Sequence, residues 1–275
     1  MAEERRRCIF CDRPENLTDE HIWGDWITEH VPRTTNKHEF LDVRVPRPGE
    51  NQPKPKRIRA GDPIGSKVKV VCAPCNSGWM SGLQNGAKPF LVPLFQGTRT
   101  IIDADAQTAI AAWVAMATMT SEHLSRDPDQ VTTPLTVRQH LMRALTAPPD
   151  WRIWIGRFQR KDWAGQWVRV TFPILDSENF PSGEVILDRR PNSQTTAFTV
   201  GKLFVFAMAC PFPRITHGWD WRTAPRARVC LQQIWPILSN PITWPLLDLT
   251  DDDASGISTA FRRYSDDLAK RVGHR

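Results

Sequence analysis

Four cysteines in two closely spaced pairs form the clearest chemical pattern in this 275-residue sequence. The first pair is Cys8 and Cys11, and the second pair is Cys72 and Cys75. A Cys-x-x-Cys spacing lets two thiolates reach one ion, and four thiolates match the tetrahedral coordination of structural zinc. The sequence therefore predicts one zinc site that joins two segments far apart in the chain.

A carboxylate, an imidazole and an amide lie close to the two cysteine pairs. Glu20 and His21 follow the first pair, and Asn76 comes directly after the second. If a strand at 17–22 pairs antiparallel with a strand at 67–71, the zinc brings His21 towards the helix that begins near Asn76. Carboxylate and amide oxygens suit a hard divalent cation, and an imidazole can take a proton from water. These three side chains are candidates for a second, catalytic metal site.

Simpler roles remain open for two of these residues. His21 could be an ordinary, partly buried histidine, and Asn76 could serve only as the N-cap of its helix. The position of His21 directly after Glu20, between the two cysteine pairs, favours a catalytic role. An N-cap and a metal ligand are compatible roles for Asn76.

In order and spacing, these residues resemble the HNH nucleases of the ββα-metal, treble-clef type, over residues 8 to about 83. The resemblance implies that His21 is the general base and that Glu20 and Asn76 hold the catalytic cation. It also implies that the four cysteines bind a structural zinc ion. Magnesium is the expected catalytic cation, because phosphate, carboxylate and amide oxygens are hard ligands, and manganese or nickel could replace it.

The activity implied by this resemblance is the metal-dependent hydrolysis of DNA phosphodiester bonds. The alternative is a catalytically inactive zinc module that binds nucleic acid or protein. It would keep the four cysteines but need no second metal ion.

Basic residues gather between the two cysteine pairs. Residues 31–66 form a proline-rich insertion, and the chain as a whole has a formal net charge of +6. Cationic side chains displace counterions from nucleic-acid phosphates, so a DNA contact is predicted here, and RNA is not excluded. An exposed loop without a partner is the alternative. The basic residues are Lys54, Lys56, Arg57, Arg59, Lys67 and Lys69.

The expected fold class is α+β in two parts. Residues 1–99 are predicted to form the zinc-stabilised nuclease module, including the insertion, and residues 100–275 a second α+β domain with an antiparallel sheet. That second domain would present the module to its substrate or form a homo-oligomer. Residues 88–94 are expected to be an extended connector. Helices are expected at 103–123, 136–145 and 257–272, and strands at 39–45, 151–160, 166–174, 195–210 and 227–234, with 195–210 divided into two strands at Gly201-Lys202.

Composition limits the class of protein. The chain is 40% hydrophobic with 12 tryptophans, which is enough to build a core. It has no apolar run of membrane-spanning length, and the charged residues 1–7 do not resemble a secretion signal. We therefore expect a cytoplasmic protein with no membrane partner, whose remaining cysteines, Cys210 and Cys230, are buried free thiols.

Overall fold

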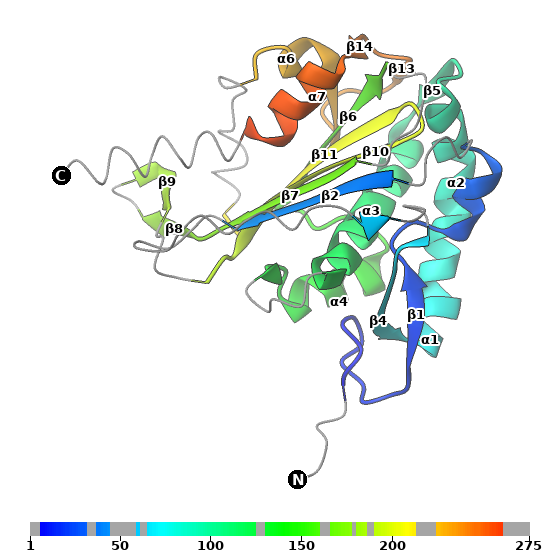
Figure 1. Ribbon diagram of the computed structural model, residues 1–275, viewed down its shortest axis with the longest axis vertical. Helices are drawn as coiled ribbons and strands as arrows, with labels where there is room; N and C mark the ends of the chain where they lie inside the picture. Colours follow the sequence, from blue (N-terminus) through cyan, green and yellow to red (C-terminus); the bar gives the residue numbers. More distant parts are fainter. Residues whose placement is uncertain are drawn as a thin grey trace.

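The computed structural model is built around one long, twisted sheet with helices on both faces (Figure 1). It describes residues 6–31, 37–44, 59–60, 65–124, 130–159, 166–177, 180–185, 190–212 and 224–260. All statements below concern these residues.

The two predicted strands beside the cysteines form a hairpin-like ladder. Strand β1 (Leu17–His21) pairs antiparallel with β4 (Lys67–Cys72), so that Leu17 lies opposite Cys72 and His21 opposite Lys67. A bulge interrupts the register after Thr18. This observation confirms the predicted antiparallel pair. Along β1, the end of the ladder beside Cys72 and the end that carries His21 are four residues apart.

A helical run with a kink at Gly78 follows β4, and it corrects the prediction of an extended connector. It consists of α1 (Ala73–Cys75), a π-helical turn η3 (Asn76–Met80) and α2 (Ser81–Gln96), and the predicted connector 88–94 lies inside α2. Pro89 and Pro93 suggested an extended segment because proline breaks helices. However, Leu83, Ala87, Leu91 and Leu94 recur at helical spacing and are all buried, and packing this stripe offsets the cost of the prolines.

The central sheet is mixed, which corrects the expected antiparallel sheet. Its strand order is β12-β6-β11-β10-β7-β2-β3. Strands β12 to β7 are antiparallel neighbours, but β2 pairs parallel with β7 and β14 pairs parallel with β6. The alternation of hydrophobic and polar residues within a strand does not specify which strand pairs with it, so these two parallel pairings were not predicted. The strands are β2 (Lys37–Arg44), β3 (Arg59–Ala60), β6 (Arg152–Phe158), β7 (Gln166–Phe172), β10 (Ser193–Val200), β11 (Leu203–Ala209), β12 (Leu231–Trp235) and β14 (Asp248–Leu249).

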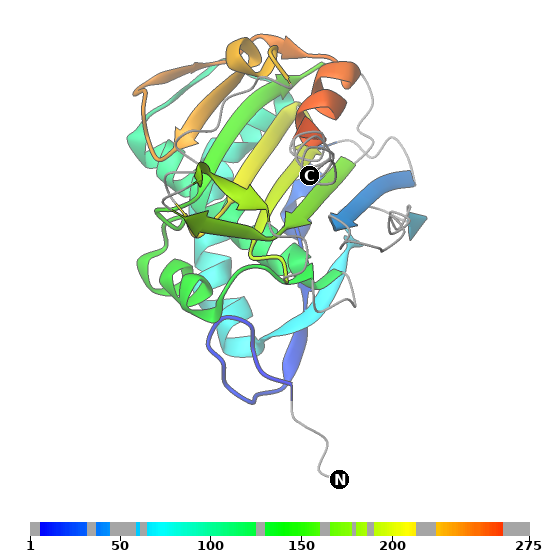
Figure 2. The ribbon, with the colours of Figure 1, turned by 90° about the vertical axis from the view of Figure 1, so that its left-hand side faces the viewer.

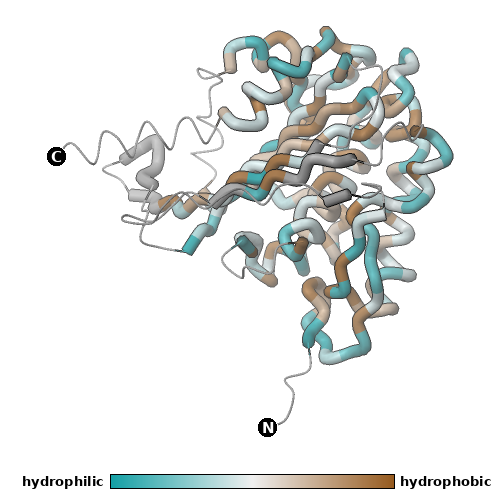
Figure 3. The backbone as a smooth tube through the Cα atoms, viewed as in Figure 1, coloured by the Kyte–Doolittle hydropathy of each residue, from teal (hydrophilic) through white to brown (hydrophobic). Residues whose placement is uncertain are grey.

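Helices cover both faces of this sheet, and its central strands are hydrophobic (Figures 2 and 3). The long helix α3 (Ala104–Ser121) packs on one face of the sheet and is buried on nearly all sides. Helix α2 packs against α3. Helix α4 (Leu135–Ala144) lies beside α3. The opposite face is covered by α6 (Ala227–Cys230) and α7 (Asp251–Ser258). Both faces of β10 and β11 are therefore buried.

The packing crosses the predicted boundary at residue 99. One hydrophobic cluster contains Phe10 and Val71 together with Trp113 and Phe198. Strand β2, which was assigned to the insertion, belongs to the central sheet. Segments on both sides of the boundary thus share one core and one sheet.

The helix near the C-terminal end begins earlier in the sequence than expected. Helix α7 begins at Asp251, where Thr250 and Asp253 form a capping box, and the acidic run lies in the first turn. The expected helix at 257–272 lies mostly outside the described residues. Smaller elements complete the structure: η1 (Asp25–Glu29), β5 (Thr100–Ile102), η4 (Glu122–Leu124), β8 (Ile174–Ser177), β9 (Phe180–Val185) and β13 (Ile242–Trp244).

Candidate metal centre and active site

The four predicted zinc ligands lie together. The sulfur atoms of Cys8, Cys11, Cys72 and Cys75 are all within 4.8 Å of one another, and Cys11 Sγ lies 3.6 Å from Cys72 Sγ. Four sulfurs at about 2.3 Å from one zinc ion are separated by about 3.8 Å, so this cluster has the dimensions of a structural zinc site. Burial raises the pKa of the Cys72 thiol to about 11, so the thiolate form depends on a bound metal ion.

Local contacts hold the two cysteine pairs in place. The N–H of Ile9 donates to the carbonyl of Val70 at 3.0 Å, which attaches the first pair to β4. The second pair sits where β4 turns into α1, with Pro74 in the first helical turn. Phe10 packs edge-on against Trp79 with ring centroids 4.9 Å apart. The metal would thus tie the N-terminal loop to the start of the helical run.

Adjacent residues on β1 point to opposite faces of the ladder, because side chains alternate along a strand. Glu20 is buried, whereas His21 is partly exposed, as is expected for neighbours on a strand. The cross-strand partners of Asp19 and His21 are Lys69 and Lys67, both exposed. One face of the ladder therefore carries the imidazole and two lysines, and the other carries the carboxylate.

Glu20 lies in a desolvated environment. The residue is 4% exposed, and burial raises the pKa of its carboxyl group to about 7. Its Oε1 accepts a long hydrogen bond of 3.5 Å from Gln84 Nε2. A carboxylate with such weak compensation is suited to a cation, which would stabilise the charged form.

His21 is arranged to stay neutral near pH 7. Burial lowers its pKa, repulsion from Lys67 lowers it further, and the attraction of Asp25 opposes both effects. Its Nε2 lies 3.9 Å from Oδ1 of Asp25, which is a longer separation than a hydrogen bond. A neutral, accessible imidazole can accept a proton, as a general base must.

Asn76 lies at the cysteine end of the ladder. Its Nδ2 donates to Oγ1 of Thr18 at 3.1 Å, and that hydroxyl donates to the carbonyl of Val71 at 3.0 Å. Asn76 is not the N-cap of a helix, because the helical run begins at Ala73. The hydrogen bonds described for Asn76 and for Glu20 thus go to different partners.

Gln84 is the neighbour of Glu20 that the sequence did not reveal. It bridges two residues: its Nε2 reaches Glu20, and its Oε1 accepts from Nε1 of Trp26 at 3.1 Å. Gln84 lies in the first turn of α2, beyond the kink at Gly78. No short-range pattern in the sequence places it beside Glu20.

The predicted basic residues are only partly described. Lys67 and Lys69 are exposed on β4, as a nucleic-acid contact requires. Arg59 belongs to β3, but its side chain lies outside the described part. Lys54, Lys56 and Arg57 also lie outside the described residues.

Comparison with known proteins gives no relative: no family model, curated protein or solved structure matches this chain. Among the described residues, the four cysteines form the only group of three or more His, Cys, Asp or Glu side chains arranged to hold a metal ion. None of the described helices has the length and apolar character needed to cross a bilayer. Cys210 and Cys230 are buried free thiols, as predicted.

Proposed function

We propose that this chain is a metal-dependent endonuclease of the HNH type that hydrolyses phosphodiester bonds in DNA. The observation that carries the proposal is the exposed face of the β1–β4 ladder, where His21 and Lys67 are direct cross-strand partners. In this proposal Lys67 holds a phosphate oxygen, Lys69 follows the nucleic-acid backbone, and His21 takes the proton from the attacking water.

Glu20 fits the role of a cation ligand, because it is a buried carboxylate with one long hydrogen bond among the described contacts. Asn76 fits it through its amide oxygen, since its Nδ2 donates to Thr18 and Oδ1 is the atom that would bind a cation. A bound divalent cation would stabilise the negative charge that develops on the phosphate and the leaving oxygen. Magnesium, manganese and nickel are the ions to compare.

The test is plasmid cleavage by zinc-loaded protein with each of these three ions. His21→Ala is expected to lose at least about 100-fold in rate, the usual contribution of a general base. His140→Ala, on helix α4 and outside the β1–β4 ladder, is the matched control and should cleave like the wild type. Equal cleavage by His21→Ala and the wild type would remove His21 from the mechanism.

A second candidate function is a zinc module that binds nucleic acid without cutting it. It is favoured by the hydrogen bonds of Glu20 and Asn76, which go to Gln84 and Thr18 respectively, so that no described contact joins the two proposed cation ligands. In this case the wild type binds DNA through Lys67 and Lys69 but cleaves with none of the ions. Binding that weakens in Lys67→Gln, combined with no cleavage by the wild type, would select this function.

A further inference from the structure

Trp79 is held beside the four-cysteine cluster by the two segments that carry the cysteines. It lies in η3, the helical turn that directly follows Cys75. Its ring packs edge-on against the ring of Phe10, with centroids 4.9 Å apart. Phe10 is fully buried and lies between Cys8 and Cys11 in the sequence. The indole therefore belongs to the packing that brings the two cysteine pairs together.

The indole N–H of Trp79 has no conventional acceptor. Its Nε1 is buried, although the ring is partly exposed, and no nitrogen or oxygen atom of the described residues accepts from it. Burial of a donor without an acceptor is unfavourable. The sulfur of Cys75 lies within hydrogen-bonding reach of the Trp79 side chain. A thiol sulfur accepts weakly, whereas the negative charge of a thiolate strengthens such a contact.

Cys75 differs from Cys8 and Cys72 in the source of its hydrogen-bond donor. The sulfurs of Cys8 and Cys72 accept from backbone N–H groups of the cysteine-bearing segments. For Cys75, the donor outside the cysteines is the side chain of Trp79. Burial raises the pKa of the Cys75 thiol, and the hydrogen bond from Trp79 opposes that rise. One ligand of the cluster thus relies on an indole where the others use the backbone.

Donors to the sulfurs matter because four thiolates outnumber the two charges of a zinc ion, so a loaded site carries net negative charge. Hydrogen bonds to the ligand atoms stabilise this charge and fix the orientation of each ligand. Loss of one such contact around a metal ion typically costs about 10- to 100-fold in metal affinity. A rigid aromatic donor that is already packed in place is suited to this role.

We propose that the indole N–H of Trp79 donates a hydrogen bond to the metal-bound thiolate of Cys75 and thereby helps the cluster to retain zinc. Phe10 positions the indole through the edge-on ring contact. The inference rests on the four-cysteine zinc site and is independent of the proposed nuclease activity.

The direct test is NMR spectroscopy of the wild-type protein loaded with an NMR-active cadmium isotope. A hydrogen bond to a metal-bound sulfur transmits scalar coupling between the metal nucleus and the donated proton. The cadmium signal should therefore correlate with one indole proton, and that correlation should be absent from Trp79→Phe. No correlation with any indole proton of the wild type would overturn the proposal.

Trp79→Phe keeps an aromatic ring beside Phe10 but removes the donor. Its zinc affinity, measured by competition with a chelator, should fall by about 10-fold or more. In the cobalt-loaded protein, the sulfur-to-metal charge-transfer band should move to lower energy, because the hydrogen bond no longer stabilises the sulfur electrons. A loss of packing alone would lower the melting temperature and leave this band in place. Equal zinc affinity and an unmoved band in Trp79→Phe would overturn the proposal.

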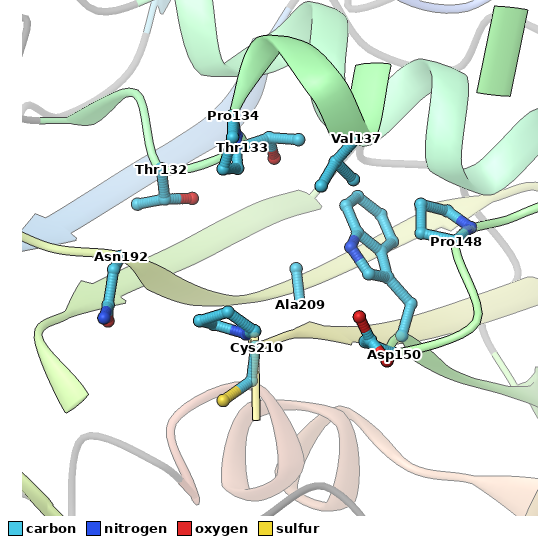
Figure 4. A pocket seen from close by; sticks show the side chains of 11 residues that line it. Thr132, Thr133, Pro134, Val137, Pro148, Asp150, Asn192, Ala209 and Cys210 are labelled. Atoms are coloured by element: carbon cyan, nitrogen blue, oxygen red, sulfur yellow. The ribbon is translucent and has the colours of Figure 1, made fainter. Parts of the chain in front are cut away.

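Trp151→Phe is the matched control for removal of an indole. Trp151 is buried and lines the pocket beside α4 that Figure 4 shows, and none of the four zinc ligands lines this pocket. Its replacement should leave the zinc affinity and the cobalt spectrum as in the wild type. If Trp79→Phe does not fold, the cadmium correlation of the wild type still decides. A wild-type cobalt spectrum without four-thiolate character would remove the zinc site and, with it, the inference.

Discussion

Glu20 should make the stability of this protein depend on pH, and Glu20→Gln is the perturbation that reveals it. The folded-state pKa of about 7 lies above the ordinary value of 4.5 because the carboxyl group is buried. Folding therefore favours the protonated form. The contribution of the protonated Glu20 carboxyl group to the free energy of unfolding is fully present below pH 4.5 and is lost as the pH rises through 7.

The size of this effect follows from the two pKa values. Their difference corresponds to about 3 kcal/mol over the whole range, at about 1.4 kcal/mol for each pH unit. Zinc sites lose their metal in acid because the thiolates become protonated, so the measurement is best made above pH 6. Between pH 6 and 8.5 the linkage relation predicts a fall of about 1.4 kcal/mol in the wild type that is absent from Glu20→Gln.

Urea denaturation of zinc-loaded protein, without other divalent ions, measures this difference at each pH. Glu29→Gln removes an exposed carboxylate in the neighbouring segment and should retain the wild-type dependence. Parallel curves for the wild type and Glu20→Gln would show that Glu20 is not desolvated in the folded protein. Added magnesium or manganese should stabilise the wild type most at pH 8.5 and leave Glu20→Gln unchanged, because the cation binds the charged carboxylate.

The remaining predictions concern four single positions. Cys72→Ser should lose bound zinc and melt at a lower temperature, as measured by metal analysis and calorimetry, and full zinc stoichiometry would exclude a shared site. Gly201→Ala should destabilise the protein by more than about 2 kcal/mol, because φ is +56° and a Cβ would meet the carbonyl of Phe95. Gly86→Ala, with open space around it in α2, should instead be stabilising by about 0.5–1 kcal/mol, and both are measured by urea denaturation. Thr250→Ala should cost about 1 kcal/mol by removing the capping box of α7, and an unchanged urea midpoint would contradict that role.

Some features of this protein follow from the sequence alone because they depend on short-range rules. Two Cys-x-x-Cys pairs predicted a four-sulfur cluster, and the structure brings those sulfurs together. The alternating pattern of 195–210, broken at Gly201, predicted β10 and β11, since a glycine with positive φ permits a tight turn. Helix α3 follows its Ala-rich run from the N-cap Asp103.

Other features were decided only by tertiary packing. The segment 88–94 is helical despite two prolines, because burial of Leu91 and Leu94 against the body outweighs the local preference. Strand β2 joins β7 in parallel across more than a hundred residues, and no local pattern encodes such a partner. Gln84 donates a hydrogen bond to Glu20, and Arg169 donates to Asp42. These contacts also join segments far apart in the sequence, so packing of the whole chain determines them. The sequence determines which side-chain groups can bind a metal ion or form a hydrogen bond, because their chemistry and local spacing are fixed by it. Long-range burial determines which of these groups come into contact in the folded protein.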